Sequence, residues 1–207
     1  MHAILRIATL SAATALLPLA AHAVTPFFES ASFVDESVAN GDYPIYDTRY
    51  LGAVFTVNSA EQVNAIGGNF TAYGDGNSIF GAIVPVGGSG MPGDVATTAV
   101  AWALFTPTGG DQTVALNNTL QPGKYALVFG SGLFGATGYS GLVAAQTAIG
   151  APTFVDYPDG TTASAFGDDT LRLTVYATAA AVPEPSMLVL WCAGSLGLLA
   201  LRSRARK

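Results

Sequence analysis

Short strand-forming runs separated by turn residues fill the middle of this chain, and no amphipathic helix of three turns interrupts them. Runs rich in β-branched and aromatic residues, bounded by Gly, Pro, Asn and Asp, are typical of β-strands. Residues 143–149 predict one or two helical turns at most. We expect strands at residues 50–57, 62–73, 78–86, 100–105, 112–116, 124–130 and 171–177, with a further one at 29–34.

Roughly eight short strands in one domain predict an all-β fold, an antiparallel β-sandwich that is jelly-roll-like or immunoglobulin-like. Alternation supports this fold, because successive side chains of a strand point to opposite faces of its sheet. In residues 100–105, Val100, Trp102 and Leu104 share one face and have alanines opposite them. We therefore expect Trp102 to lie in the core rather than on a sugar-binding surface.

The first 23 residues have the layout of a secretory signal peptide. Arg6 supplies a positive charge, residues 7–20 are mostly apolar, and Ala21 and Ala23 place small residues where signal peptidase requires them. We expect export through the Sec machinery and cleavage by signal peptidase between Ala23 and Val24. The apolar run is too short to favour a retained anchor across ~30 Å of hydrocarbon.

Cleavage there removes both histidines of the chain, His2 and His22, and the single cysteine, Cys192, lies near the opposite end. A Ser-His-Asp triad, a Cys-His pair and a histidine-ligated metal site are then excluded from the mature body. We expect no catalytic residues, no metal-ligand set and no disulfide. The protein is therefore predicted not to be an enzyme.

Three different segments follow one another at the C-terminus. Pro183, Glu184 and Pro185 form a stiff, extended stretch, because each proline fixes its own φ and restricts the residue before it. Residues 187–201 carry no charge and are mostly leucine, alanine and glycine. The chain then ends in a basic cluster (residues 202–207) that holds Arg202, Arg204, Arg206 and Lys207.

An uncharged helix of about 15 residues rises only ~22 Å, which is short for a bilayer. Basic residues directly after such a helix follow the positive-inside rule and can reach the lipid headgroups, which lengthens the effective span. We predict a single transmembrane helix at about residues 187–201. The basic tail would then lie in the cytoplasm and the body outside it.

This order of Pro-Glu-Pro, short apolar helix and terminal arginine cluster resembles the PEP-CTERM sorting signal of Gram-negative bacteria. The resemblance covers residues 182–207 and implies processing by an exosortase, a membrane-embedded cysteine transpeptidase. It implies that Pro183, Glu184 and Pro185 are the recognition element and that the tail is discarded. Members of this family are associated with bacteria that produce exopolysaccharide and form biofilms or flocs.

The body, residues 24–181, also resembles the short β-sandwich domains that often precede such tails, chiefly through residues 79–86, 120–138 and 171–177. It contains 13 acidic and three basic residues, a net charge near −10. Such a charge disfavours nucleic acid and anionic polymers as partners but is compatible with calcium. Residues 74–77 and 156–169 offer oxygen ligands for calcium in loops, although ordinary solvated turns explain them equally.

Two further features of the body suggest ligands. Paired aspartates in residues 156–169 are candidates for glycoside hydrolysis, although Asp beside Pro and Gly is a common turn former. Tyr43, Tyr46 and Tyr50 form an aromatic loop that could stack on sugar rings or cover a sandwich edge. We expect an exported surface or matrix protein, first anchored in the inner membrane with its body in the periplasm. The body would be a structural or interaction module, or alternatively a carbohydrate-binding module for exopolysaccharide.

Overall fold

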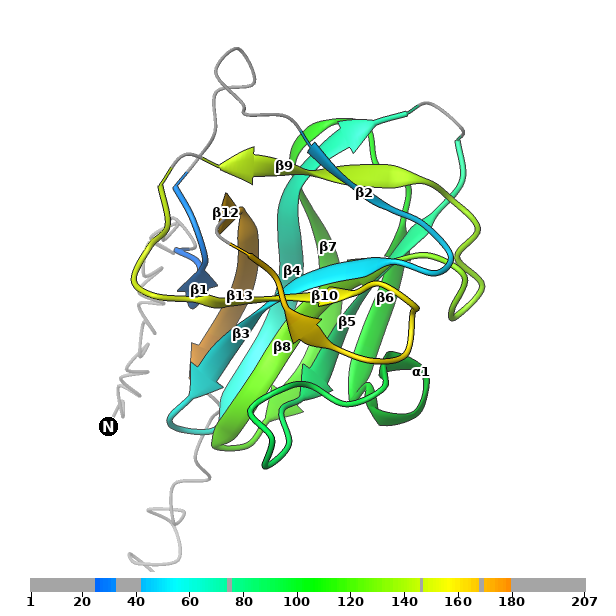
Figure 1. Ribbon diagram of the computed structural model, residues 1–207. Helices are drawn as coiled ribbons and strands as arrows, with labels where there is room; N and C mark the ends of the chain where they lie inside the picture. The colour runs from blue at the N-terminus through cyan, green and yellow to red at the C-terminus, as the bar shows by residue number, and fades with distance from the viewer. Residues whose placement is uncertain (1–24, 33–41, 74–75, 146, 168–169, 180–207) are drawn as a thin grey trace, which may run out of the picture.

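The computed structural model describes residues 25–32, 42–73, 76–145, 147–167 and 170–179, which form an all-β body (Figure 1). One short helix, α1 (Val95–Thr98), is present within these ranges. The strands are β1 (Phe28–Glu29), β2 (Asp42–Ile45), β3 (Tyr50–Val57), β4 (Glu61–Ala72), β5 (Ile79–Pro85), β6 (Ala101–Phe105), β7 (Gly110–Leu120), β8 (Gly123–Gly130), β9 (Ser140–Ala145), β10 (Thr153–Tyr157), β11 (Ser164–Ala165), β12 (Thr170–Leu171) and β13 (Leu173–Ala179).

The strands form two antiparallel sheets that pack on one another as a sandwich. The seven-stranded sheet has the order β1-β13-β4-β9-β12, with β2 paired to β9 and β7 paired to β4. The six-stranded sheet has the order β11-β10-β3-β8-β5-β6, so β6 and β11 are its edge strands. In Figure 1, β2 and β9 cross the top of the molecule and β6 lies towards the right.

The main core lies between the two sheets. Phe70 of β4 meets Phe129 of β8 edge-on, with ring centroids 5.0 Å apart, and both side chains are fully buried. Leu51, Ile83 and further apolar side chains from both sheets complete this cluster. This packing explains why apolar residues alternate along the strands: each strand directs every second side chain into the space between the sheets.

A second apolar layer covers the outer face of the six-stranded sheet. Phe80, Val128 and Val155 point outward from their strands and are nevertheless buried. Residues of the segments 86–99 and 131–139 pack over them. The central strands of this sheet therefore have both faces covered, and continuous apolar runs such as that of β5 satisfy both layers.

The expected strands at residues 50–57, 62–73, 78–86, 100–105 and 124–130 are confirmed as β3 to β6 and β8, with small shifts in their ends. The strand expected at 112–116 is confirmed as the longer β7, and the one expected at 171–177 is divided at Arg172 between β12 and β13. Of the strand expected at 29–34, only Glu29 lies in a strand, β1; residues 30–32 lie outside any strand, and residues 33–34 lie outside the described ranges. The helical turns expected from residue 143 are wrong, since residues 140–145 form a strand that pairs with β2, β4 and β12. α1, β2, β10 and β11 were not expected from the sequence.

Candidate functional site

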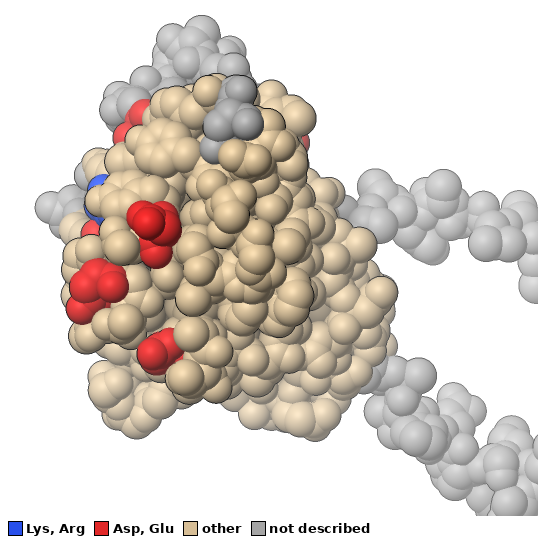
Figure 2. All heavy atoms as spheres, turned by 90° about the vertical axis from the view of Figure 1, so that its right-hand side faces the viewer, with Lys and Arg blue, Asp and Glu red and all other residues tan. Residues whose placement is uncertain are grey.

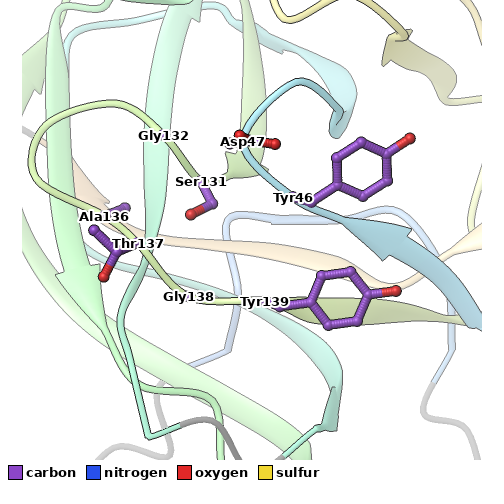
Figure 3. Close-up of a pocket in the computed structure, with 8 residues that line it drawn as sticks. All are labelled: Tyr46, Asp47, Ser131, Gly132, Ala136, Thr137, Gly138 and Tyr139. Carbon is purple, nitrogen blue, oxygen red and sulfur yellow. The ribbon is translucent and has the colours of Figure 1, made fainter.

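A pocket of about 470 Å³ opens where the turn after β2 meets the loop between β8 and β9 (Figure 3). Its lining consists of two aromatic side chains, three polar ones, one alanine and two glycines: Tyr46, Asp47, Ser131, Gly132, Ala136, Thr137, Gly138 and Tyr139. Except for buried Ser131, the polar groups are on exposed residues. The pocket is therefore open to solvent and offers hydroxyl and carboxylate groups beside aromatic rings.

Two tight backbone arrangements shape this pocket. Tyr46 and Arg49 exchange backbone hydrogen bonds of 3.2 Å in each direction, which turns the chain sharply at Asp47. In the facing loop, Gly132 donates to the carbonyl of Ala136 at 3.0 Å and has a φ of 78°. A Cβ at Gly132 would lie 2.8 Å from the carbonyl oxygen of Asp47, so glycine lets the two walls approach closely.

The aromatic wall of the pocket belongs to a cluster of three tyrosines. The rings of Tyr46 and Tyr139 are nearly parallel, with centroids 6.4 Å apart and an interplanar angle of 15°, and Figure 3 shows their hydroxyls pointing the same way. Tyr73 packs on Tyr139 at 4.7 Å. The Tyr73 hydroxyl donates a hydrogen bond to Asp42 Oδ2. Burial, and then this bond, raise the pKa of Tyr73, so the hydroxyl remains a donor.

Of the three tyrosines proposed from the sequence, the structure brings only Tyr46 to the pocket. Tyr43 packs edge-on against Phe166, with centroids 4.8 Å apart, at the rim of the core. Tyr50 is 3% exposed and belongs to the outer apolar layer. Its hydroxyl donates to the Asp47 carbonyl at 3.3 Å, so Tyr50 supports the turn that carries the pocket.

Sequence reasoning missed Tyr139, whose ring lies beside Tyr46, and Tyr73, which packs on Tyr139. They come from the end of β4 and the start of β9, whose last and first residues pair in the seven-stranded sheet. Nothing in the local sequence around either residue indicates this meeting, because it depends on strand pairing. Tyr73 and Tyr139 each stand directly beside a glycine-rich turn. This is the one local signal that their side chains are exposed.

Two aspartates of the loops considered for calcium or for hydrolysis, Asp156 and Asp159, have local partners in the structure, whereas Asp75 of the loop at residues 74–77 lies outside the described residues. Asp156 binds Arg49, with Oδ2 3.0 Å from Nη2 and Oδ1 3.3 Å from Nε. Asp159 accepts hydrogen bonds from the backbone amides of Thr162 and Thr161, which lower the pKa of its carboxyl. Asp168 and the neighbouring Asp169 lie outside the described residues. Within the described ranges no group of three or more His, Cys, Asp or Glu residues is placed to hold a metal ion.

A second exposed cluster surrounds Trp102 on β6. The expectation that Trp102 lies in the core is wrong, since its exposed fraction is 47%. Its face of β6 points outward at the edge of the sheet, whereas Ala101, Ala103 and Phe105 pack against the core. The indole stacks on Phe134, with ring centroids 4.8 Å apart and an interplanar angle of 8°. Phe134 has a φ of 56°, an uncommon backbone conformation outside glycine.

The residues proposed for export and sorting lie outside the part of the chain that the structure describes. They are Ala21, Ala23 and Val24, Pro183, Glu184 and Pro185, and the basic cluster of residues 202–207. Within the described ranges, no helix has the length and apolar character needed to cross a bilayer. No protein-family model matches this chain, and no curated protein matches its sequence.

Proposed function

We propose that this protein is exported, held briefly in the inner membrane by its C-terminal segment, and released by an exosortase to the cell surface or extracellular matrix. The order of Pro183-Glu184-Pro185, an uncharged segment and a terminal basic cluster carries the proposal. The signal-peptide pattern of residues 1–23 supports it, since export must come before such sorting. A body without cysteine suits an oxidising compartment, where a free thiol would be modified.

In this proposal the apolar segment stops transfer across the membrane, and the basic cluster holds its cytoplasmic end through the positive-inside effect. The stiff Pro-Glu-Pro stretch then stands at the outer surface of the membrane in an extended form that an enzyme can bind. The body acts without catalysis or a cofactor, as a structural or interaction module. Its sandwich belongs to the jelly-roll-like or immunoglobulin-like type.

The test follows the processing of the chain in a host with and without its exosortase. Loss of the exosortase should leave a longer form in the membrane fraction, and a Glu184→Ala variant should accumulate the same form in the intact strain. Ala179→Ser, four residues before the motif, is the matched control and should be processed normally. Processing that is unchanged in the exosortase-deficient strain rejects the sorting proposal.

The tyrosine pocket favours a second role for the body, binding of carbohydrate. The near-parallel rings of Tyr46 and Tyr139 offer flat apolar surfaces, and Asp47 and Thr137 offer hydrogen-bonding groups beside them. Sugar rings have both an apolar face and a rim of hydroxyls, so this pairing suits them. Exopolysaccharide is the carbohydrate that the resemblance of the tail suggests.

Calorimetric titration with soluble exopolysaccharide fragments, with and without calcium, tests this role. Tyr139→Ala should weaken binding about tenfold or more, because it removes one ring of the pair. Trp102→Ala removes an exposed aromatic residue elsewhere and should leave binding unchanged. Absence of heat and of any shift in thermal unfolding with every fragment rejects carbohydrate binding at this pocket.

A further inference from the structure

β6 is an edge strand that lacks three common protections of an edge: charge, proline and a bulge. Among the described strands it pairs only with β5, and the register between the two runs without a bulge. Residues 100–105 contain no charged residue and no proline. Natural sheets commonly shield their edges with lysine, proline or bulges, because a bare edge can pair with another chain.

The same strand and the residue before it carry an exposed apolar row, which we call the β6 row: Val100, Trp102 and Leu104. Their exposed fractions are 47%, 47% and 37%. They share one face of the sheet, and the indole of Trp102 is supported from below by Phe134. The row is therefore a preformed apolar surface directly beside a backbone edge that can accept a further strand.

Charge singles out this face of an otherwise acidic body. The net charge of the body is near −10, yet residues 76–155 contain only Asp94, Asp111 and Lys124 as charged residues. Asp94 caps α1, accepting from the Ala96 amide at 2.8 Å, and Asp111 binds Arg172. Figure 2 shows acidic side chains along one margin of the side on which β6 lies, and a broad uncharged area across the rest.

We propose that this face binds a second copy of the chain through antiparallel pairing of the two β6 strands. A two-fold axis near the middle of the strand would place the β6 row of one copy beside the same row of the other. Antiparallel pairing sets directly opposed side chains on the same face, so the apolar rows meet and the two six-stranded sheets become continuous. The inference names the partner of the interaction module proposed above and depends on the body alone, not on export or sorting.

The charge distribution favours a second copy over other occupants. Two bodies of charge near −10 repel one another on most approaches, and the uncharged β6 face is where this repulsion is weakest. A sugar would need polar partners beside the rings, but the row itself is apolar. The carbonyl of Val100, directly before β6, already accepts a hydrogen bond from the Asn118 side chain at 3.3 Å, so the pairing between copies is confined to residues 101–105.

The test is sedimentation velocity of the full chain in a mild non-ionic detergent, over a range of protein concentrations. The wild type should form a dimer as concentration rises. Trp102→Lys and Leu104→Lys should each weaken dimerisation at least tenfold, because they bring like charges together across the two-fold axis. Thr153→Lys changes the net charge equally on an exposed residue of β10, near the opposite edge of the same sheet, and should dimerise normally.

Circular dichroism and thermal unfolding of each variant separate loss of pairing from loss of folding, and Leu104→Lys serves where Trp102→Lys unfolds. A wild type that stays monomeric at about 100 µM overturns the inference, as does a dimer that survives in both folded β6 variants. In the second case the terminal apolar segments or another surface make the contact. Exosortase processing of Trp102→Lys is expected to be normal, so the two proposals fail independently.

Discussion

Arg172 is a buried cation that joins three separate parts of the chain. Its Nε donates to Asp111 at 2.8 Å, and its Nη1 donates to Glu29 and, at 2.6 Å, to the carbonyl of Ala31. Burial lowers the pKa of Arg172, but the bonds to Glu29 and Asp111 outweigh it and raise the pKa overall. The arginine thus ties β1 and β7 to the segment between β12 and β13.

We expect Arg172→Met to lower the free energy of unfolding by about 3 kcal/mol, because it leaves two carboxylates and a carbonyl without their donor. Arg49→Met is the matched control. The Arg49 side chain is 22% exposed against 9% for Arg172, and its one ion pair within the described ranges is to Asp156, so about 1 kcal/mol or less should be lost. Urea unfolding of both variants at neutral pH checks the difference. Equal losses would show that burial does not decide the strength of these pairs.

Tyr157, in the outer apolar layer, makes the stability of the fold depend on pH in the alkaline range. The side chain is fully buried, and its hydroxyl donates to the Gly93 carbonyl at 2.8 Å. Burial, and then the charge of Asp94, raise the pKa of Tyr157 above its ordinary value of 10.0. The folded state thus favours the neutral phenol. The stability that the folded protein gains from the neutral Tyr157 is present in full below pH 10. It declines as the pH rises towards the higher pKa of Tyr157 in the folded protein.

Tyr157→Phe should cost about 1 kcal/mol at pH 7, through loss of the bond to Gly93. Above pH 10, the variant should lose stability with pH less steeply than the wild type, since one buried group no longer ionises. Urea unfolding between pH 7 and pH 11 measures both effects. A variant with the same alkaline slope as the wild type would contradict the assignment to Tyr157.

At the scale of single elements, β5 shows how one glycine sets the spacing between the sheets. Gly81 faces the main core between Ile79 and Ile83. A Cβ there would lie 2.5 Å from Cε1 of Phe129 and 2.7 Å from Cδ1 of Ile66. The rings and branched side chains of β4 and β8 therefore fill the space that a side chain at this position would need.

Gly81→Ala should destabilise the body by about 1–3 kcal/mol, because an added methyl group overpacks the core. Gly88→Ala is the control, since a Cβ at Gly88 meets no heavy atom within 4 Å and its φ is not positive. The control should leave stability unchanged or raise it slightly. Thermal unfolding compares the two variants. A Gly81→Ala protein as stable as the wild type would mean that the sheets can separate without cost.

At the scale of the whole molecule, charge is distributed unevenly over the sandwich. Eleven of the 13 acidic residues of the body lie outside residues 76–155, and the central stretch provides β5 to β9 with almost no charge. The proposed dimer joins the uncharged sides and leaves the acidic sides apart. Added salt should therefore stabilise the proposed dimer, whereas it would weaken an interface made of ion pairs.

Raising the salt concentration from ~20 mM to ~500 mM should tighten the proposed dimer, because it screens the repulsion between two acidic bodies. Apolar contacts at the β6 row do not weaken with salt. Sedimentation at both concentrations gives the two dissociation constants. A dimer that dissociates at high salt would place ion pairs at the contact and would contradict pairing through β6.

The strands and their sandwich packing could be read from residue order, because alternation and turn residues are local properties of the chain. The assignments that failed depended on partners distant in sequence. Residues 140–145 look neither helical nor strongly extended, and only pairing with β2, β4 and β12 makes them a strand. Alternation correctly grouped Trp102 with Val100 and Leu104, but it cannot tell which face of an edge strand is covered.

The pocket shows the same division. Tyr46 could be proposed as an exposed aromatic residue from its loop, while Tyr73 and Tyr139 join it only because β4 and β9 pair. Tyr43 and Tyr50, from the same stretch of chain, are drawn into apolar packing by Phe166 and Phe80. Local sequence thus specified backbone form and the character of each side chain. Long-range packing selected which side chains meet and which stay exposed, because burial depends on neighbours that lie far away along the chain.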